Sequence, residues 1–143
     1  FSEAAKMVSL SLRLFGNIRP ASQDLDTAEA FNYGMAEWGK TGTPPKDMFE
    51  RVIALDSNSD YGHGANYHQC IALALWATGS KQDALGRIKK AEDLVVERSK
   101  PEFSCWRYMM VTLSDFQEDC KQIRCLFEGK EVYPSFFPKE KTL

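Results

Sequence analysis

Residues 65–98, ANYHQCIALALWATGSKQDALGRIKKAEDLVVER, constrain the fold of this chain more than any other stretch. Apolar residues recur at helical spacing in both halves of these 34 residues, and Gly79 stops the first half. Ser80 followed by Asp83 is a capping pattern that starts a new helix. The stretch therefore predicts two amphipathic helices that fold back on each other at Gly79. Their apolar positions are Ile71, Leu75 and Trp76 in the first helix and Ala84, Ile88, Ala91 and Leu94 in the second.

The same stretch resembles one tetratricopeptide (TPR) repeat. The large and small packing positions of that family match Ile71, Ala72, Leu75, Gly79, Ala84, Ile88 and Ala91. His68 falls at the early aromatic packing position of the repeat, so we expect a packed imidazole with one hydrogen-bonded nitrogen. A role for His68 as a base or a metal ligand is the alternative.

Weaker matches to the repeat flank the central one. Upstream, Asp26 and Glu29 form a capping pattern that predicts a helix from Thr27 to about Lys40, ended by Gly42. A second helix follows two prolines, of which Pro45 departs from the small residue of the family. Downstream, the sequence predicts a third hairpin, made of a helix that ends near residue 113 and a helix that runs from Asp115 to Gly129. The Ser114 and Gln117 pair is the start signal of that last helix.

These patterns predict an all-α protein, in which antiparallel helix hairpins stack as a short TPR-like right-handed solenoid. Residues 1–26 form an N-terminal segment and linker, in which residues 1–18 fit both a strand and a helix pattern and a helix is favoured. Residues 27–130 form the helical repeat domain, and residues 131–143 a tail with prolines and aromatic residues. The tail either caps the last hairpin, since terminal repeats must cover an apolar face, or docks on another protein.

A second resemblance covers residues 9–17, SLSLRLFGN, which are similar to a signature of the membrane-embedded a subunit of rotary ATP synthases. In that family the arginine matched by Arg13 faces the carboxylates of the rotor ring, and the asparagine matched by Asn17 lies near the proton path. The match stops at Ile18, where Arg19 and Pro20 replace the continuing transmembrane helix of the family. Such an arginine separates proton paths only in a low-dielectric layer between helices. The stretch is thus either a solvated amphipathic helix or a fused or split piece of such a subunit.

The charge and the hydropathy of the chain limit which classes of partner we expect. The chain carries 18 basic and 20 acidic residues in mixed order, without a basic stripe, so we expect no nucleic-acid binding. No run approaches the roughly 20 apolar residues that span a bilayer, so we expect no integral membrane insertion. A chain of 143 residues buries about two thirds of its unfolded surface, so its stability requires no metal. We expect no cofactor.

The four cysteines lack the C-x-x-C spacing of zinc and redox sites. Cys70, Cys105, Cys120 and Cys125 are interpreted as reduced and mostly buried thiols, with two disulfides in an exported protein as the alternative. Reduced thiols and the lack of a signal-peptide pattern favour the cytoplasm. A mitochondrial or membrane-peripheral location follows if the ATP synthase resemblance holds.

The sequence offers little catalytic chemistry. It contains no G-x-S-x-G or H-E-x-x-H motif, and its glycines form no phosphate-binding loop. Paired carboxylates such as Glu92 with Asp93 and Glu118 with Asp119 fall on predicted solvated faces, where nothing separates their pKa values. We therefore expect a protein that is not an enzyme, and keep an enzyme as an alternative.

The TPR resemblance implies a binding groove on the concave face, built from the first helices of the hairpins. Its groove positions match Glu29, Asn32, Asn66, Gln69, Trp76 and Arg107. Amides, an indole and a guanidinium suit an extended peptide backbone and one carboxylate. The expected function is a scaffold or adaptor that binds a peptide or partner helix of another protein. The alternatives are an ATP-synthase-associated subunit, an enzyme, and ordinary polar surface at these positions. Self-association through the terminal hairpins stays open.

Overall fold

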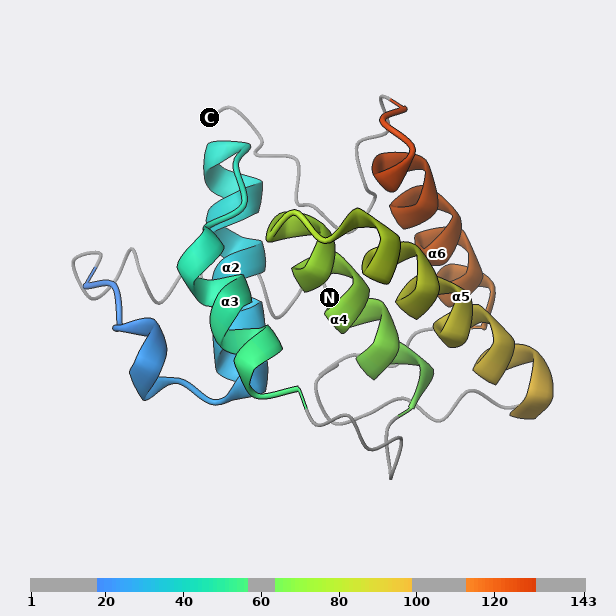
Figure 1. The fold of residues 1–143 in the computed structure, drawn as a ribbon, viewed down its shortest axis with the longest axis horizontal. Helices are drawn as coiled ribbons and strands as arrows, with labels where there is room; N and C mark the ends of the chain where they lie inside the picture. Colours follow the sequence, from blue (N-terminus) through green and yellow to red (C-terminus); the bar gives the residue numbers. More distant parts are fainter. Residues whose placement is uncertain (1–17, 57–63, 99–112, 131–143) are drawn as a thin grey trace.

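The computed structural model describes residues 18–56, 64–98 and 113–130 (Figure 1). These ranges contain helices and no strand, so the all-α prediction is confirmed for them. The N-terminal segment before Ile18, residues 99–112 and the tail lie outside the described residues. The elements are the short 3-10 turn η1 (Ser22–Asp24) and the helices α2 (Thr27–Thr41), α3 (Lys46–Ala54), α4 (Ala65–Ala77), α5 (Lys81–Arg98) and α6 (Leu113–Phe127).

In the first helix pair, α2 begins at Thr27 and ends before Gly42, as the sequence indicates, and α3 follows the two prolines. The Asp26 carboxylate accepts a hydrogen bond of 2.8 Å from the backbone N–H of Glu29, and the Glu29 carboxylate accepts one of 2.9 Å from the backbone N–H of Asp26. This reciprocal capping satisfies two N–H groups at the start of α2. Gly42 ends the helix with φ 78°, a conformation that favours glycine.

The second helix pair, α4 and α5, turns at Gly79, whose φ is 94°. Ile71, Ala84, Ile88 and Ala91 are fully buried, and Leu75 is half-buried against the same core. Because these residues recur at helical spacing, each helix presents one apolar face to the other. The predicted hairpin over residues 65–98 is therefore present, with Gly79 at its turn.

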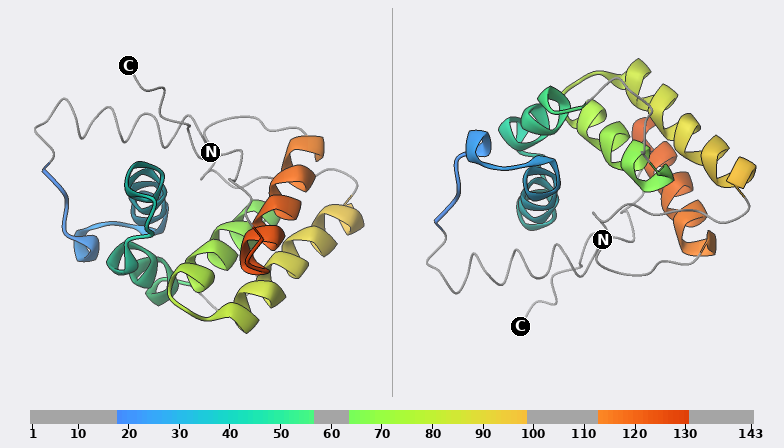
Figure 2. Two further views of the ribbon diagram at one scale, coloured as in Figure 1. Left: turned by 90° about the horizontal axis from the view of Figure 1, so that it is seen from above. Right: turned by 90° about the horizontal axis from the view of Figure 1, so that it is seen from below.

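The helices form two layers (Figure 2). The outer layer contains α3 and α5, and the inner layer contains α2, α4 and α6. Helix α6 packs against both α5 and α4. Gln69 meets Cys120, and Trp76 meets Phe127. The two contacts are seven residues apart on both helices, which is about two turns, so α4 and α6 run parallel with matched register.

The position of α6 differs from the prediction of a second helix in a third hairpin. A second helix would belong to the outer layer and run antiparallel to α4, whereas α6 lies beside α4 and parallel to it. Helix α6 also begins at Leu113, so Ser114 lies inside its first turn and is not the residue before the helix. Its buried stripe packs against the rest of the core and consists of Phe116, Cys120, Ile123 and Phe127.

None of the helices in the described ranges is both long and apolar enough to cross a membrane. The stability of these helices comes from one continuous apolar cluster that spans all five of them. Within the cluster, α2 passes close to α3 at Gly34, where a Cβ atom would lie 2.9 Å from the ring of Phe49.

Candidate functional site

The six predicted groove residues are in unequal environments. Arg107 lies outside the described residues, and Asn66 is the second residue of α4. Glu29 is exposed in the first turn of α2, and Asn32 is half-buried one turn later. Gln69 and Trp76 follow along α4 and are both engaged by α6. The structure thus brings Gln69 and Trp76 into the interface between α4 and α6, and leaves Glu29 and Asn32 on α2, away from that interface.

Glu29 already has a structural role, because its carboxylate caps the start of α2. The side chain is exposed nonetheless, so the second oxygen of the carboxylate remains open to solvent and keeps its acceptor capacity. A partner at this position would therefore contact a carboxylate whose orientation is fixed by the capping hydrogen bond.

Gln69 is only 1% exposed and lies between α4 and α6. Its Nε2 donates a weak hydrogen bond to Sγ of Cys120 at 3.6 Å. Its Oε1 has no hydrogen-bond partner in the part of the chain that the structure describes. An unpaired buried acceptor costs roughly 1–3 kcal/mol, so the α4–α6 contact carries an unfavourable polar contribution at this residue.

Trp76 is half-buried, and both faces of its indole are covered. The ring of Trp38 from α2 lies 5.5 Å away at an interplanar angle of 10°, and the ring of Phe127 from α6 lies 6.0 Å away at 18°. Near-parallel aromatic rings at these centroid distances attract each other beyond their area burial. We call Trp38, Trp76 and Phe127 the aromatic stack; it joins the three helices of the inner layer.

A polar network that sequence reasoning missed connects the two helix pairs near the start of α4. The Arg87 guanidinium donates to both oxygens of Asp56, at 2.8 and 3.2 Å, and its Nε donates to Nδ1 of His68 at 3.2 Å. The Tyr67 hydroxyl donates to the Asp56 carboxylate.

His68 is 1% exposed, so the prediction of a packed imidazole with a hydrogen-bonded nitrogen is confirmed. No local sequence motif predicts the contact between Asp56 and Arg87, because the two residues are 31 positions apart in the chain.

A second charged cluster holds the segment before η1 against the first helix pair. Arg19 donates to the carboxylates of Glu37 in α2 and of Asp47 in α3, with bonds to Asp47 of 2.7 and 2.8 Å. The hydrogen bond from Arg19 lowers the pKa of Asp47 below its ordinary value, and burial opposes this only in part. The same two carboxylates raise the pKa of Arg19. The cluster is exposed, so its net contribution to stability is small.

The described cysteines are reduced thiols outside any disulfide: Cys70 and Cys120 are buried and Cys125 is half-buried. Cys105 lies outside the described residues. No group of three or more His, Cys, Asp or Glu side chains within residues 18–56, 64–98 and 113–130 is arranged to hold a metal ion.

Comparison with protein-family models, with curated proteins and with solved structures found no match to this chain. The arrangement that bears on binding is the inner layer, where Gln69 and Trp76 are covered by α6 and where Glu29 and Asn32 reach solvent.

Proposed function

We propose that this protein is a non-enzymatic, TPR-like interaction module that binds an extended peptide or partner helix of another protein on its inner layer. The observation that carries the proposal is the matched register of α4 and α6, given by the contacts of Gln69 with Cys120 and of Trp76 with Phe127. Antiparallel helix pairs whose first helices run parallel in one layer are the arrangement that creates a binding surface in helical repeat proteins.

The contact with α6 supports the idea that the inner layer accepts helices. Helix α6 places the small Cys120 against Gln69 and the aromatic Phe127 against Trp76, two turns further on. An amphipathic helix in a groove uses anchors at this kind of spacing. Since α6 already covers Gln69 and Trp76, a partner would contact the inner layer beside α2, where Glu29 and Asn32 are accessible.

The residues at α2 indicate the chemistry of the partner. Glu29 offers a carboxylate oxygen, and the Asn32 amide offers both a donor and an acceptor. A backbone N–H group or a basic side chain would satisfy the carboxylate, and an exposed peptide bond would satisfy the amide. The proposal therefore favours a partner segment with accessible backbone groups and at least one basic residue.

An affinity purification with matched variants tests the proposal. The full chain, the variant Asn32→Arg and the control variant Gln82→Arg are compared, because Gln82 is an exposed amide residue on the outer-layer helix α5. Circular dichroism is recorded for each protein to show that it is folded. We expect a partner that is recovered with the wild type and with Gln82→Arg but lost with Asn32→Arg.

The outcomes also separate the alternative functions. Equal recovery with both arginine variants would contradict a binding surface at α2. Recovery of rotary ATP synthase subunits would select the function that the resemblance at residues 9–17 implies. Turnover in a substrate screen would select an enzyme.

A further inference from the structure

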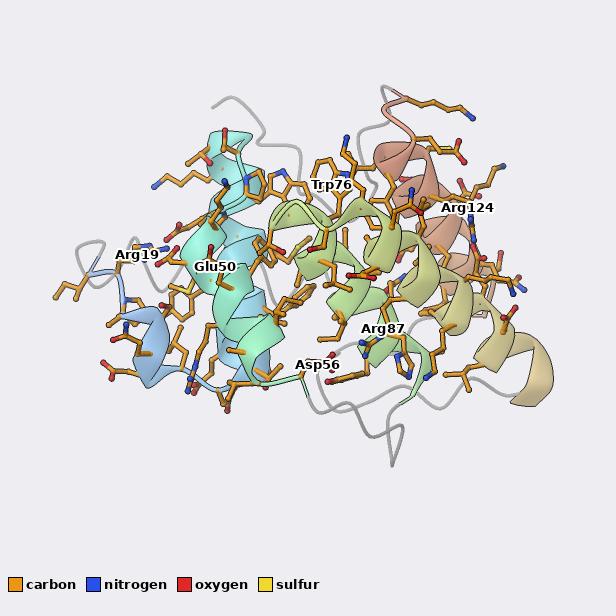
Figure 3. The ribbon with its side chains drawn as sticks, viewed as in Figure 1. Arg19, Glu50, Asp56, Trp76, Arg87 and Arg124 are labelled. Atoms are coloured by element: carbon orange, nitrogen blue, oxygen red, sulfur yellow. The ribbon has the colours of Figure 1, made fainter. Side chains whose placement is uncertain are left out.

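The polar network of Asp56, Tyr67, His68 and Arg87 lies where the two helix pairs meet. Asp56 follows α3 and so belongs to the end of the first pair, Tyr67 and His68 lie in the first turns of α4, and Arg87 lies in α5. Figure 3 shows Asp56 and Arg87 pointing toward each other across this junction. Arg87 also places its guanidinium over the ring of Tyr67, 5.9 Å from the centroid. The network thus connects the first helix pair to both helices of the second.

The hydrogen bonds fix the protonation state of His68. A guanidinium N–H can only donate, so the Nδ1 of His68 that receives the Arg87 Nε–H at 3.2 Å must carry a lone pair. The imidazole is therefore neutral, with its proton on Nε2. A second proton would have to bind at Nδ1, where it would face the N–H group of Arg87. Two cations would then meet at hydrogen-bond distance in a site where His68 is 1% exposed.

Among the described residues, the charged groups of the neighbouring elements are as follows. Asp56 lies just after the end of α3, and its carboxylate accepts hydrogen bonds from Arg87 of α5 and from the Tyr67 hydroxyl of α4. Helix α3 itself turns Arg51 toward the carbonyl oxygen of Leu25 at 3.0 Å. Helix α6 meets α4 through Gln69 and Trp76, and its buried carboxyl residue Asp119 directly precedes Cys120 in the sequence.

We propose that His68, Arg87 and Asp56 form a proton-sensitive latch that joins the two helix pairs at neutral pH and opens when His68 takes up a proton. Protonation turns the Nδ1 acceptor into a donor, which repels the guanidinium. Arg87 must then move, and its movement breaks both hydrogen bonds to Asp56. The junction between the first and second helix pairs loosens as a result. This role is independent of the partner binding proposed for α2.

The sign of the pH dependence follows from this geometry. An imidazole in an unfolded chain takes up its proton near pH 6.5, whereas the folded network excludes that proton. Below this pH the unfolded state binds more protons than the folded state, so stability falls as the pH falls. Above it, both states are neutral at His68, and the network contributes fully.

Urea unfolding of the full chain at about pH 7.5 and about pH 5.5 tests the latch, since a free histidine changes its charge between these values. The variant His68→Asn keeps an acceptor close to the position of Nδ1 and cannot be protonated. The control variant His63→Asn removes the other histidine of the chain. We expect the equilibrium constant for folding of the wild type and of His63→Asn to fall by up to about tenfold at the lower pH, and that of His68→Asn to change much less.

Equal pH dependence of the wild type and His68→Asn would overturn the proposal. A second measurement applies even if His68→Asn does not fold: nitrogen NMR of the wild-type imidazole reports the protonation of each ring nitrogen directly. The latch requires an unprotonated Nδ1 at neutral pH, and a protonated Nδ1 there would refute it. Near-UV circular dichroism should also change on acidification before the helices unfold, because Trp38 and Trp76 report the contact between the two helix pairs.

Discussion

The indole rings of Trp38 and Trp76 stack at a centroid distance of 5.5 Å and an angle of 10°, and they tie the first helix pair to the second. The opposite face of Trp76 meets Phe127 of α6. All three rings come from the last turns of inner-layer helices, and each helix is followed by a glycine with positive φ. The glycines end each helix within about one turn of its aromatic residue, so the rings gather at one edge of the molecule.

Replacing Trp76 by alanine should destabilise the fold. The change removes two aromatic contacts and a large apolar side chain from the junction of α2, α4 and α6. We expect a loss of about 2–4 kcal/mol in the free energy of unfolding, which is less than full burial would give because the indole is half-buried. Urea unfolding measures the loss.

The variant Trp76→Phe is the matched control, since it retains a stacked ring of smaller area. It should cost less than half as much as Trp76→Ala. An unchanged unfolding free energy for Trp76→Ala, together with weaker partner binding, would instead assign the tryptophan to the binding surface.

Local signals explain why much of the fold could be predicted. The reciprocal capping of Asp26 and Glu29 and the stop at Gly42 depend on residues within one or two turns, and sequence spacing displays them directly. The same holds for the hairpin around Gly79. Whether α6 belongs to the inner or the outer layer could not be predicted in this way, because a helix in either layer has the same spacing of apolar residues in its sequence.

The candidate site was less predictable for a related reason. The position of Gln69 in the repeat indicates a groove residue, but its burial depends on Cys120, 51 residues away. The network around His68 likewise depends on Asp56 and Arg87, whose types are common on solvated surfaces. Tertiary contacts of this kind leave no periodic pattern in the chain.

Replacing Ile88 by alanine tests the register of the second helix pair. Ile88 is fully buried in the central cluster, so the change leaves a cavity that the surrounding side chains fill only in part. The expected loss is roughly 2–5 kcal/mol in the free energy of unfolding. The exposed neighbour Lys89 is the control, and Lys89→Ala should change stability by less than about 0.5 kcal/mol. Equal effects of the two substitutions would mean that the helix faces are assigned wrongly.

A pair of glycine substitutions separates close packing from helix propensity. Gly34→Ala would place a methyl group 2.9–3.2 Å from the fully buried ring of Phe49, so α2 and α3 must separate or distort. We expect a loss of about 1–3 kcal/mol from this overpacking. Gly86→Ala, in the middle of α5, meets no atom within 4 Å and should raise stability by about 0.5–1 kcal/mol. A thermal unfolding series distinguishes these opposite signs, and stabilisation by Gly34→Ala would contradict the close approach.

The Arg19 cluster predicts a specific dependence on acid. Arg19 lowers the folded-state pKa of Asp47 below its ordinary value of 3.8, so the carboxylate contributes stability above that pH. As the pH falls through the folded-state pKa, Asp47 becomes protonated in both states and the contribution is lost.

The side chain of Asp47 is 46% exposed, so Asp47→Asn should cost no more than about 1 kcal/mol at neutral pH, and less in high salt. The measurement is the difference in unfolding free energy between wild type and variant from neutral pH into acid. The difference should shrink below about pH 3.8 and vanish once the pH is below the lowered folded-state pKa of Asp47. Asp93→Asn, which breaks the exposed pair with Lys89 on α5, is the control and should cost about 0.3–0.5 kcal/mol. A difference for Asp47→Asn that persists unchanged in acid would show that Asp47 acts through packing rather than through its charge.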